Sequence, residues 1–441
     1  MFEKKFIGLL YNSLLLVALM LSTCVSLHAQ TSMETIKAAL KDHGFSNIRA
    51  VSEDSVTILA IQNDAYKLQA SGIAAAIRTL EDEGILDGGT VRMLILDCDV
   101  PQLTLTYDSR RGDWDVSHHV ERSDWKSVRR DSKTNSSFGK IDLVVYPQIS
   151  LMNLIITQVY QSLWQLNPAI EMTLWPGSKI SYQVKIPVWN DGYGNREDKI
   201  HPGMITLSQR FRLPFDITGK AVAGVFYNNR YGLGIEMQKR FSFAPWLMLE
   251  GGFRMLGLSY FDSFVFHRSK DMERFWNLGV NLYWPEVNTE FKVKAEKFLL
   301  ADVGAKAEMI RHFRYCSIGF YVEKGFNSYA KTNGGFRFQI ALPPYRFKRA
   351  GYWPRVTTSG QMGMVYNANN EQRWYKETKL ESSDNIMNSN AFNPYYIKSE
   401  IKSLNRQWQK TGNKERRKRL KASIDDSNKM IDEKIEDKQY N

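Results

Sequence analysis

The sequence is poor in cysteine and in long apolar runs. Its 441 residues contain 3 cysteines, and Cys24 lies in the N-terminal apolar segment, so Cys98 and Cys316 remain for the folded chain. Two thiols exclude the multiple-bridge framework of small secreted domains. Because no cysteine and histidine pair has zinc-like spacing, and the adjacent His118 and His119 are more typical of a polar loop, we expect no metal and no cofactor.

The one long apolar run lies at the start of the chain. Lys4 and Lys5 precede Phe6 to Leu21, and a small-residue exit ends at Ala29. This pattern predicts a secretory signal peptide over residues 1–29, which would export the protein. The alternatives are an uncleaved anchor helix and, at Leu21-Ser22-Thr23-Cys24, acylation of Cys24, for which Thr23 is a poor preceding residue.

The mean hydropathy of −0.39 excludes a helical transporter. It does not exclude a membrane-spanning β-barrel, since such a barrel has as many lumen-facing polar residues as lipid-facing apolar ones. The charged fraction of 24% and the hydrophobic fraction of 43% are ordinary for a folded protein. Composition therefore leaves the class to be decided by pattern.

Strict two-residue alternation of apolar and polar side chains recurs in long runs. Such runs occur at Lys179 to Val188, Tyr231 to Arg240, Trp276 to Trp284, Ala301 to Met309 and Phe336 to Leu342. A tilted strand needs roughly 9 to 11 residues to cross a bilayer, and a spanning sheet must close because lipid satisfies no free backbone group. We therefore predict a mainly β fold, an antiparallel outer-membrane β-barrel of about twelve strands, with a range of ten to fourteen, over residues 140–346.

The face opposite the apolar one carries charges of both signs. Its candidate lumen or polymer contacts are Arg210, Arg212, Glu236, Arg240, Glu296, Asp302, Lys306 and Glu308. They indicate either a wet passage for a hydroxyl-rich or anionic polymer or a ladder of neutralising charges that plugs a small barrel. Alternation alone does not separate the two.

The periodicity differs before the barrel. Apolar spacing predicts helices near Ile36 to Leu40 and Leu68 to Leu80, with strands around them, which gives a small periplasmic α+β module over residues 30–109. Asp97 and Asp99 end a strand before Pro101, where turn-forming carboxylates are expected rather than catalytic ones.

Residues 110–139 are polar and without period, which predicts a linker. In it, Trp114 and Trp125 are candidate sugar-stacking side chains, although isolated tryptophans as readily fix a loop to its neighbour.

The last part of the chain, residues 347–441, reads as a polar and charged tail. Ile397, Ile401, Leu404 and Trp408 recur at helical spacing, and Lys414 to Lys421 is densely basic. We therefore predict a helical or partly disordered tail. It would be a solvated charged helix, or it would bind an anionic polymer, lipid headgroups or a partner protein. The tail contributes to the net charge of +12, which in an exported protein is no sign of nucleic-acid binding.

Short motifs resemble the YjbH-like exopolysaccharide family. They are Lys297-Phe298-Leu299-Leu300-Ala301-Asp302-Val303-Gly304, Gly234-Ile235-Glu236, Leu249 to Phe253, Pro176-Gly177 and Ile340-Ala341-Leu342-Pro343. The resemblance implies an outer-membrane component of exopolysaccharide or capsule export, with polysaccharide, outer-membrane lipid and other secretion proteins as partners and no catalytic residues to carry over. The chain departs from longer members of the family, which resemble two barrels in tandem.

Two alternatives to an export component remain. One is an outer-membrane enzyme acting on lipid or glycan at the barrel rim, and the other is a small porin-like or structural barrel. The residue types for the enzyme are present, although no nucleophile motif joins them: His201, His267, His312, Ser259, Ser263 and Asp262. We therefore predict a protein without catalytic residues.

Overall fold

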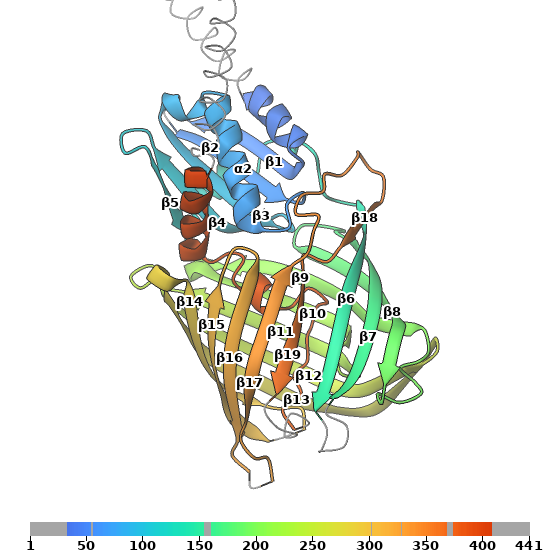
Figure 1. The fold of residues 1–441 in the computed structure, drawn as a ribbon. Helices are drawn as coiled ribbons and strands as arrows, with labels where there is room; N and C mark the ends of the chain where they lie inside the picture. Colours follow the sequence, from blue (N-terminus) through green and yellow to red (C-terminus); the bar gives the residue numbers. More distant parts are fainter. Residues whose placement is uncertain are drawn as a thin grey trace, which may run out of the picture.

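The computed structural model describes residues 33–53, 56–153, 160–300, 302–327, 329–367 and 374–407. Two bodies of β structure stand one above the other, joined by the chain near residue 140 (Figure 1). The predicted signal peptide and the basic Lys414 to Lys421 segment lie outside the described residues. Within them, no helix is long and apolar enough to cross a bilayer.

The smaller body, the N-terminal module, is a five-stranded sheet in the order β1-β2-β3-β4-β5. Its strands are β1 (Phe45–Glu53), β2 (Val56–Asn63), β3 (Thr90–Asp97), β4 (Val100–Asp108) and β5 (Asp113–Ser117). Strands β2 and β3 are parallel, which requires a crossover, and this is made by α2 (Gln69–Asp82) and η1 (Ile85–Gly88). A helix over residues 33–42 precedes β1, and α3 (Arg122–Val128) follows β5.

The module has an apolar core on each face of its sheet. On one face, Ile36 and Leu40 of the first helix and Ile73 and Ile77 of α2 are at most 1% exposed. On the other face, α3 and Trp125 cover a smaller group that includes Leu94. The helices and strands expected from apolar spacing between residues 36 and 107 are confirmed.

The region 110–139, predicted as a linker, is instead part of the module. Strand β5 pairs with β4, and α3 packs under the sheet. The segment is polar because each element is short and shows only one side to the core. Periodicity cannot build up over five or seven residues.

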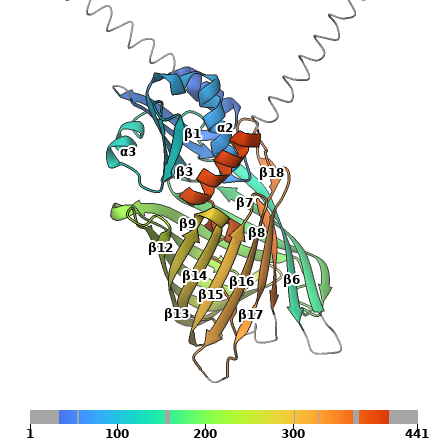
Figure 2. The same cartoon turned by 60° about the vertical axis from the view of Figure 1, so that its left-hand side comes forward.

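The larger body is a 14-stranded sheet, antiparallel except at one edge. In sheet order its strands are β18 (Arg355–Thr358), β6 (Ile141–Asn153), β7 (Tyr160–Met172), β8 (Ser178–Asp191), β9 (His201–Leu213), β10 (Ile217–Phe226), β11 (Arg230–Arg240), β12 (Leu247–Asp262), β13 (Val265–Trp284), β14 (Thr289–Lys297), β15 (Val303–His312), β16 (Cys316–Gly325), β17 (Asn333–Ala341) and β19 (Gln361–Asn367). Short 3-10 turns lie at Pro214–Asp216 (η2) and Pro285–Val287 (η3). The sheet curls round on itself, so β19 lies beside β6 (Figures 1 and 2).

The two outermost strands of this sheet are consecutive pieces of one segment. Strand β18 pairs in parallel with β6, and β19, only Ser359 and Gly360 later, pairs antiparallel with β17. The pairing continues across the joint, where the amide of Ser359 donates to Val145 at 2.7 Å and the amide of Leu342 donates to Gly360 at 2.9 Å. Residues 355–367 therefore bridge the first and the last long strand.

The sheet thus extends beyond Arg346, the predicted end of the barrel. The expected number of about twelve matches β6 to β17, and β18 and β19 bring the count to fourteen, the upper end of the predicted range. The bridging segment was assigned to the tail because it is only partly alternating. Its four-residue and seven-residue strands are too short to show a period.

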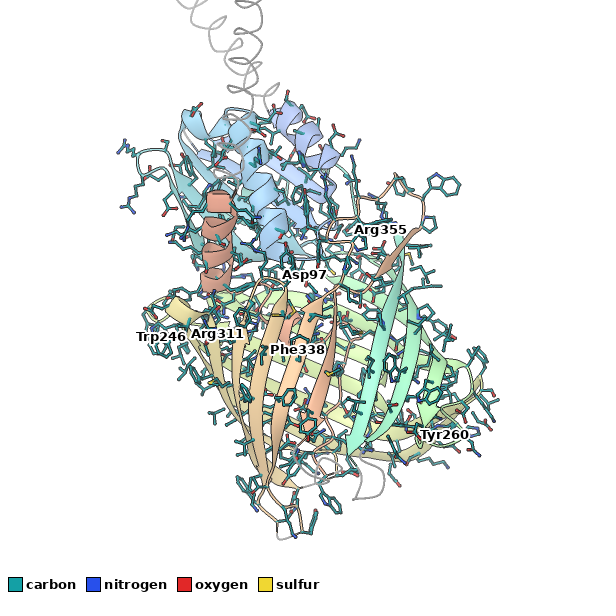
Figure 3. All side chains as sticks on the ribbon, in the orientation of Figure 1. Asp97, Trp246, Tyr260, Arg311, Phe338 and Arg355 are labelled. Atoms are coloured by element: carbon teal, nitrogen blue, oxygen red, sulfur yellow. The ribbon has the colours of Figure 1, made fainter. Side chains whose placement is uncertain are left out.

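The outer surface of the curled sheet is apolar. Leu233, Leu278 and Val293 are 57%, 65% and 59% exposed, and they lie on the face that alternation assigned to lipid. Large exposed aromatics lie near both ends of the strands, for example Trp246 at the end nearer the module and Tyr260 at the far end (Figure 3). The outer side of this sheet is apolar, whereas the outer side of a water-soluble barrel is polar.

Candidate functional site

The interior of the curled sheet is lined with charged side chains. Lys306 is 1% exposed, Glu290 2% and Glu296 5%, and each lies on the strand face opposite the apolar surface. Buried charges are stable only when they are paired, and here the ladder register places opposite charges side by side. Arg254 donates to Glu236 at 2.7 Å, and Lys220 lies 3.4 Å from the same carboxylate.

The chain itself fills this interior. After β19, residues 374–389 run inside the sheet from its far end back to the module, and we call this stretch the inner segment. It begins at the far end, where Trp374 packs on Tyr329 and Tyr375 packs on Phe298. It ends in α4 (Ile386–Ser389), where Met387 packs against Leu68 of the module.

Acidic side chains of the inner segment meet the cations of the sheet. Glu381 accepts from Arg210 at 3.1 Å, from Lys220 at 3.3 Å and from Ser208 at 2.7 Å. Lys220 also donates to Asp384 at 2.5 Å. These contacts come from two neighbouring strands, so Glu381 fixes the inner segment against β9 and β10.

A second carboxylate of the inner segment, Glu377, contacts the strands on the opposite side of the interior. It forms an ion pair with Lys306 and lies 3.3 Å from Arg337 and 3.8 Å from Lys294. A cavity of about 60 Å³ remains beside it, room for about a water molecule or two. The inner segment is therefore held by charge on both sides of the interior.

One apolar contact also holds the inner segment in place. Leu380 is fully buried among Val222, Leu256 and Phe275, which point inward. It lies against Gly234, where an added Cβ would come 2.7 Å from the leucine Cδ1. The glycine thus leaves the space that the leucine side chain occupies.

The structure separates the predicted lumen residues into three groups. Arg210, Glu236, Glu296, Lys306 and Glu308 line the interior as expected, and Glu308 lies 3.2 Å from Arg337. Arg212 and Arg240 lie at the rim instead, because they are at the ends of their strands. Asp302 is exposed in the loop before β15, because that strand begins two residues later than alternation indicated.

The two candidate sugar-stacking tryptophans are not equivalent. Trp114 is 5% exposed in the core of the module, packed on Tyr107, so its ring faces are not open to a ligand. Trp125 on α3 is half-buried, stacks near the Arg49 guanidinium and lines a cleft described below. The structure therefore contradicts the interpretation of Trp114 as a ligand contact, and this side chain packs in the core of the module as part of a strand, not in a loop.

Arg210 of the interior and residues of the rim together dock the module onto the sheet. Arg210 donates to Asp97 at 2.5 Å, and the amide of Gly177 donates to the carbonyl of Cys98 at 2.6 Å. Arg212 donates to the carbonyls of Pro101 and Gln102 at 3.3 and 3.2 Å. The predicted turn at residues 97–99 is confirmed, and it is also a docking contact (Figure 3).

Two histidines contribute to the same interface. The His118 ring lies 2.8 Å from the carbonyl of Arg240, and burial lowers the pKa of His118 to about 4. The His119 ring lies 2.7 Å from Asp216 and 3.0 Å from Glu121, and the hydrogen bond to Asp216 raises the pKa of His119. His119 is therefore the one that favours its protonated form.

The helix over residues 394–407 completes the interface. Ile397 is fully buried and Ile401 4% exposed in the module core, and Arg314 of the β15–β16 turn donates to Glu400 at 2.7 Å. The predicted helical spacing is confirmed for Ile397, Ile401 and Leu404, whereas Trp408 lies outside the described residues. The apolar face of this helix is packed, not solvated.

A cleft of about 1080 Å³ lies between α3 and the rim of the large sheet. The turn after β9 and the loop after β11 form its lower wall, and Trp125 belongs to the upper one. Four aromatic rings line it, together with several cations. A hollow of this volume could admit a ligand.

The structure does not bring together the residue types named for an enzyme. His267 stacks on Tyr260 in the exposed β12–β13 hairpin, Asp262 pairs with Lys199 at 3.2 Å, and His201 lies near Glu197 at 3.7 Å. These groups are engaged with other partners.

His312 instead belongs to a row of hydrogen-bonded side chains that the sequence did not predict. Its Nδ1 lies 2.9 Å from the hydroxyl of Ser317, and its Nε2 lies 3.4 Å from Glu290. Ser317 is fully buried, and the ring of Tyr396 covers the histidine with centroids 5.9 Å apart. A serine nucleophile must reach its substrate, so this buried arrangement is structural. The register of β15 with β16 places His312 opposite Ser317, so an assignment of that strand pair would have predicted this contact.

Among the described residues, no three His, Cys, Asp or Glu side chains are grouped so as to hold a metal ion.

Comparison with known proteins gives little further information. No family model and no curated protein matches the chain. Two solved structures, both mutants of the porin of Rh. blastica, align at 9% identity over 45% of this chain and 89% of theirs, with TM-scores of 0.27 and 0.24. At such scores the likeness supports no argument about fold or function.

Proposed function

We propose that this protein is an outer-membrane β-barrel whose interior is filled by its own chain, and that it serves without catalysis in the export or assembly of a surface polysaccharide. The supporting observation is the inverted polarity of the large sheet. Exposed Leu278 and Val293 face outward, while Glu290 and Lys306 are buried inside. Such a surface suits hydrocarbon outside and paired charges within.

The bridging segment supports a closed barrel. Residues 355–358 pair with β6 and residues 361–367 pair with β17, so this segment lies between the first and the last long strand and would close the proposed ring there. A bilayer requires this closure because it offers no water to unpaired backbone groups. Twelve long strands and the bridge then form one wall.

The module gives the barrel an orientation. The turns at the module end are short, for example η2 and η3, as on the periplasmic side of outer-membrane barrels. Exposed Trp175, Trp246 and Trp284 at this end fit an interfacial belt. The module, and the helix that ends the described chain, would lie in the periplasm.

The filled interior favours an anchor over an open conduit. The inner segment, held by Glu377 and Glu381, occupies the space through which a polymer would pass. The role in polysaccharide export is supported by the resemblance to the YjbH-like family. In this role, the barrel would hold the periplasmic module where secretion proteins assemble.

The role can be tested by deleting the gene and measuring surface polysaccharide. We expect loss of polymer, which the wild-type gene and the Ser317→Ala, His267→Ala and His312→Ala variants restore. If the Ser317→Ala gene does not restore polymer, although the folded protein is present in normal amounts, the enzyme alternative would be favoured. Unchanged polymer after deletion would refute the export role.

The barrel itself needs a separate measurement. A closed outer-membrane barrel migrates differently on a detergent gel before and after heating, and fractionates with the outer membrane. Purified protein that stays in solution without detergent would refute the membrane position, whatever the outcome for the polysaccharide.

A further inference from the structure

The cleft beside α3 is open and mixed in character. Its rings are Trp125, Phe215, Phe241 and Phe243, of which Phe215 and Phe243 are 81% and 83% exposed. Large apolar side chains so exposed on neighbouring turns are costly in water and mark interaction surfaces. The cleft therefore needs an apolar partner.

The cleft also has cations without counter-charges. Arg122, Arg129 and Lys239 line it, and among the described residues their side chains form no hydrogen bond or ion pair. The carboxylates nearby are already engaged, since Asp216 pairs with Arg212 at 2.6 Å and Asp99 with Arg49 at 2.8 Å. The remaining carboxylate, Glu121, lies 3.0 Å from His119. The free charge of the cleft is therefore positive.

The position of Lys239 links the cleft to the outer surface. It follows Leu233 and Met237 at two-residue spacing, on the outward face of β11, and its ammonium lies 5.2 Å from the centre of the Phe241 ring. Lysines at the ends of lipid-facing strands extend toward headgroups. The cleft thus opens at the height of the proposed membrane interface.

We propose that this cleft binds an anionic phospholipid of the periplasmic leaflet. Arg122, Arg129 and Lys239 would contact its phosphate, while Phe215 and Phe243 lie against its acyl chains. The inference rests on the proposed membrane position of the barrel. An acidic sugar polymer fits less well, because the only neutral polar side chains on the walls are Ser123 and Ser242.

The test is native mass spectrometry of the full-length protein released from bilayers. Vesicles contain phosphatidylglycerol and phosphatidylcholine in equal amounts. We expect phosphatidylglycerol to be retained in excess by about tenfold or more, since each basic residue near a lipid headgroup contributes roughly a fivefold preference for anionic lipid. The variant Arg122→Gln/Arg129→Gln/Lys239→Gln should lose this excess.

A matched control removes the same charge elsewhere. Arg110→Gln/Lys126→Gln/Lys270→Gln changes three exposed cations that do not line the cleft, and it should keep the excess. Equal retention of both lipids by the wild-type protein would overturn the inference without any variant. Displacement of the lipid by an acidic oligosaccharide would overturn it in favour of a glycan site.

Insertion is measured separately by trypsin protection in phosphatidylcholine vesicles. A protein that does not insert contradicts the proposed function. A protein that inserts but has no preference for phosphatidylglycerol contradicts only the lipid site.

Discussion

The module and the large sheet use the same residue types on opposite sides. In the module, Leu59 and Leu105 are fully buried in the core. In the large sheet, Leu233 and Leu278 are more than half exposed, while Lys306 and Glu323 are buried. The exposed leucines of the large sheet are the basis of its proposed membrane position, since apolar side chains leave water for either a core or a bilayer.

The largest expected effect comes from removing a carboxylate in the charged interior. In Glu381→Ala, Arg210 and Lys220 lose an acceptor within 3.3 Å. Breaking a buried ion pair costs about 3 to 5 kcal/mol, so we expect the inner segment to leave the barrel. Trypsin cleavage within residues 374–389 and a lower urea midpoint would report this.

The matched control is Glu83→Ala, at an exposed site beyond α2 in the module. It should leave both measurements unchanged. Protection equal to wild type in Glu381→Ala would show that the charged contacts do not hold the inner segment.

A charge on the outer surface tests the apolar side of the comparison. Leu278→Arg places a cation where we expect hydrocarbon, which should cost about 2 to 4 kcal/mol in a bilayer. Val265→Arg, in the hairpin beyond the proposed membrane, should cost less than about 1 kcal/mol. Unfolding by urea in lipid vesicles measures both, and equal costs would argue against a bilayer around β13.

Filling the space at Gly234 tests the inner segment without changing charge. In Gly234→Val, the new side chain meets Leu380, and overpacking of this kind costs roughly 1 to 3 kcal/mol. Gly251→Val is the control, since a Cβ there has its nearest neighbour at 3.7 Å. We expect trypsin to cut the inner segment in the first variant only.

The smallest effect is the pH dependence of docking. His118 keeps a folded pKa of about 4, whereas its ordinary value is 6.5, so between these values the unfolded chain binds more protons. Its contribution is fully present above about pH 6.5 and declines toward pH 4, by roughly 1 to 2 kcal/mol. His118→Gln should flatten this part of a thermal-stability profile.

His119 acts with the opposite sign. Because Asp216 raises its pKa, its contribution is fully present below pH 6.5 and is lost as the pH rises through the folded value. His119→Gln should therefore leave the acid side of the profile unchanged. A loss of the acid slope in His119→Gln instead of His118→Gln would contradict the assignment.

Alternation predicted much of the large sheet, because long strands between two different environments carry a clear period. The run from Lys179 to Val188 became β8, and that from Tyr231 to Arg240 became β11. It also named Arg210, Glu236 and Lys306 as interior residues. Each of these positions is fixed by local spacing alone.

The inner segment was beyond such reasoning. Glu377, Leu380 and Glu381 have no period of their own, and their positions depend on contacts with strands 40 to 173 residues away in sequence. The same holds for β5 and α3, which are short and polar. Contacts between distant segments, not local patterns, decide these elements.

The bridge at residues 355–367 has a consequence for biosynthesis. Arg355 holds Asp142 through two hydrogen bonds of 2.8 Å, joining positions 213 residues apart. Strand β6 therefore lacks its partner on this side until most of the polypeptide has been made. A chain cut short before residue 355 would lack both the bridge and the inner segment, which would leave one edge of β6 unpaired and the interior unfilled.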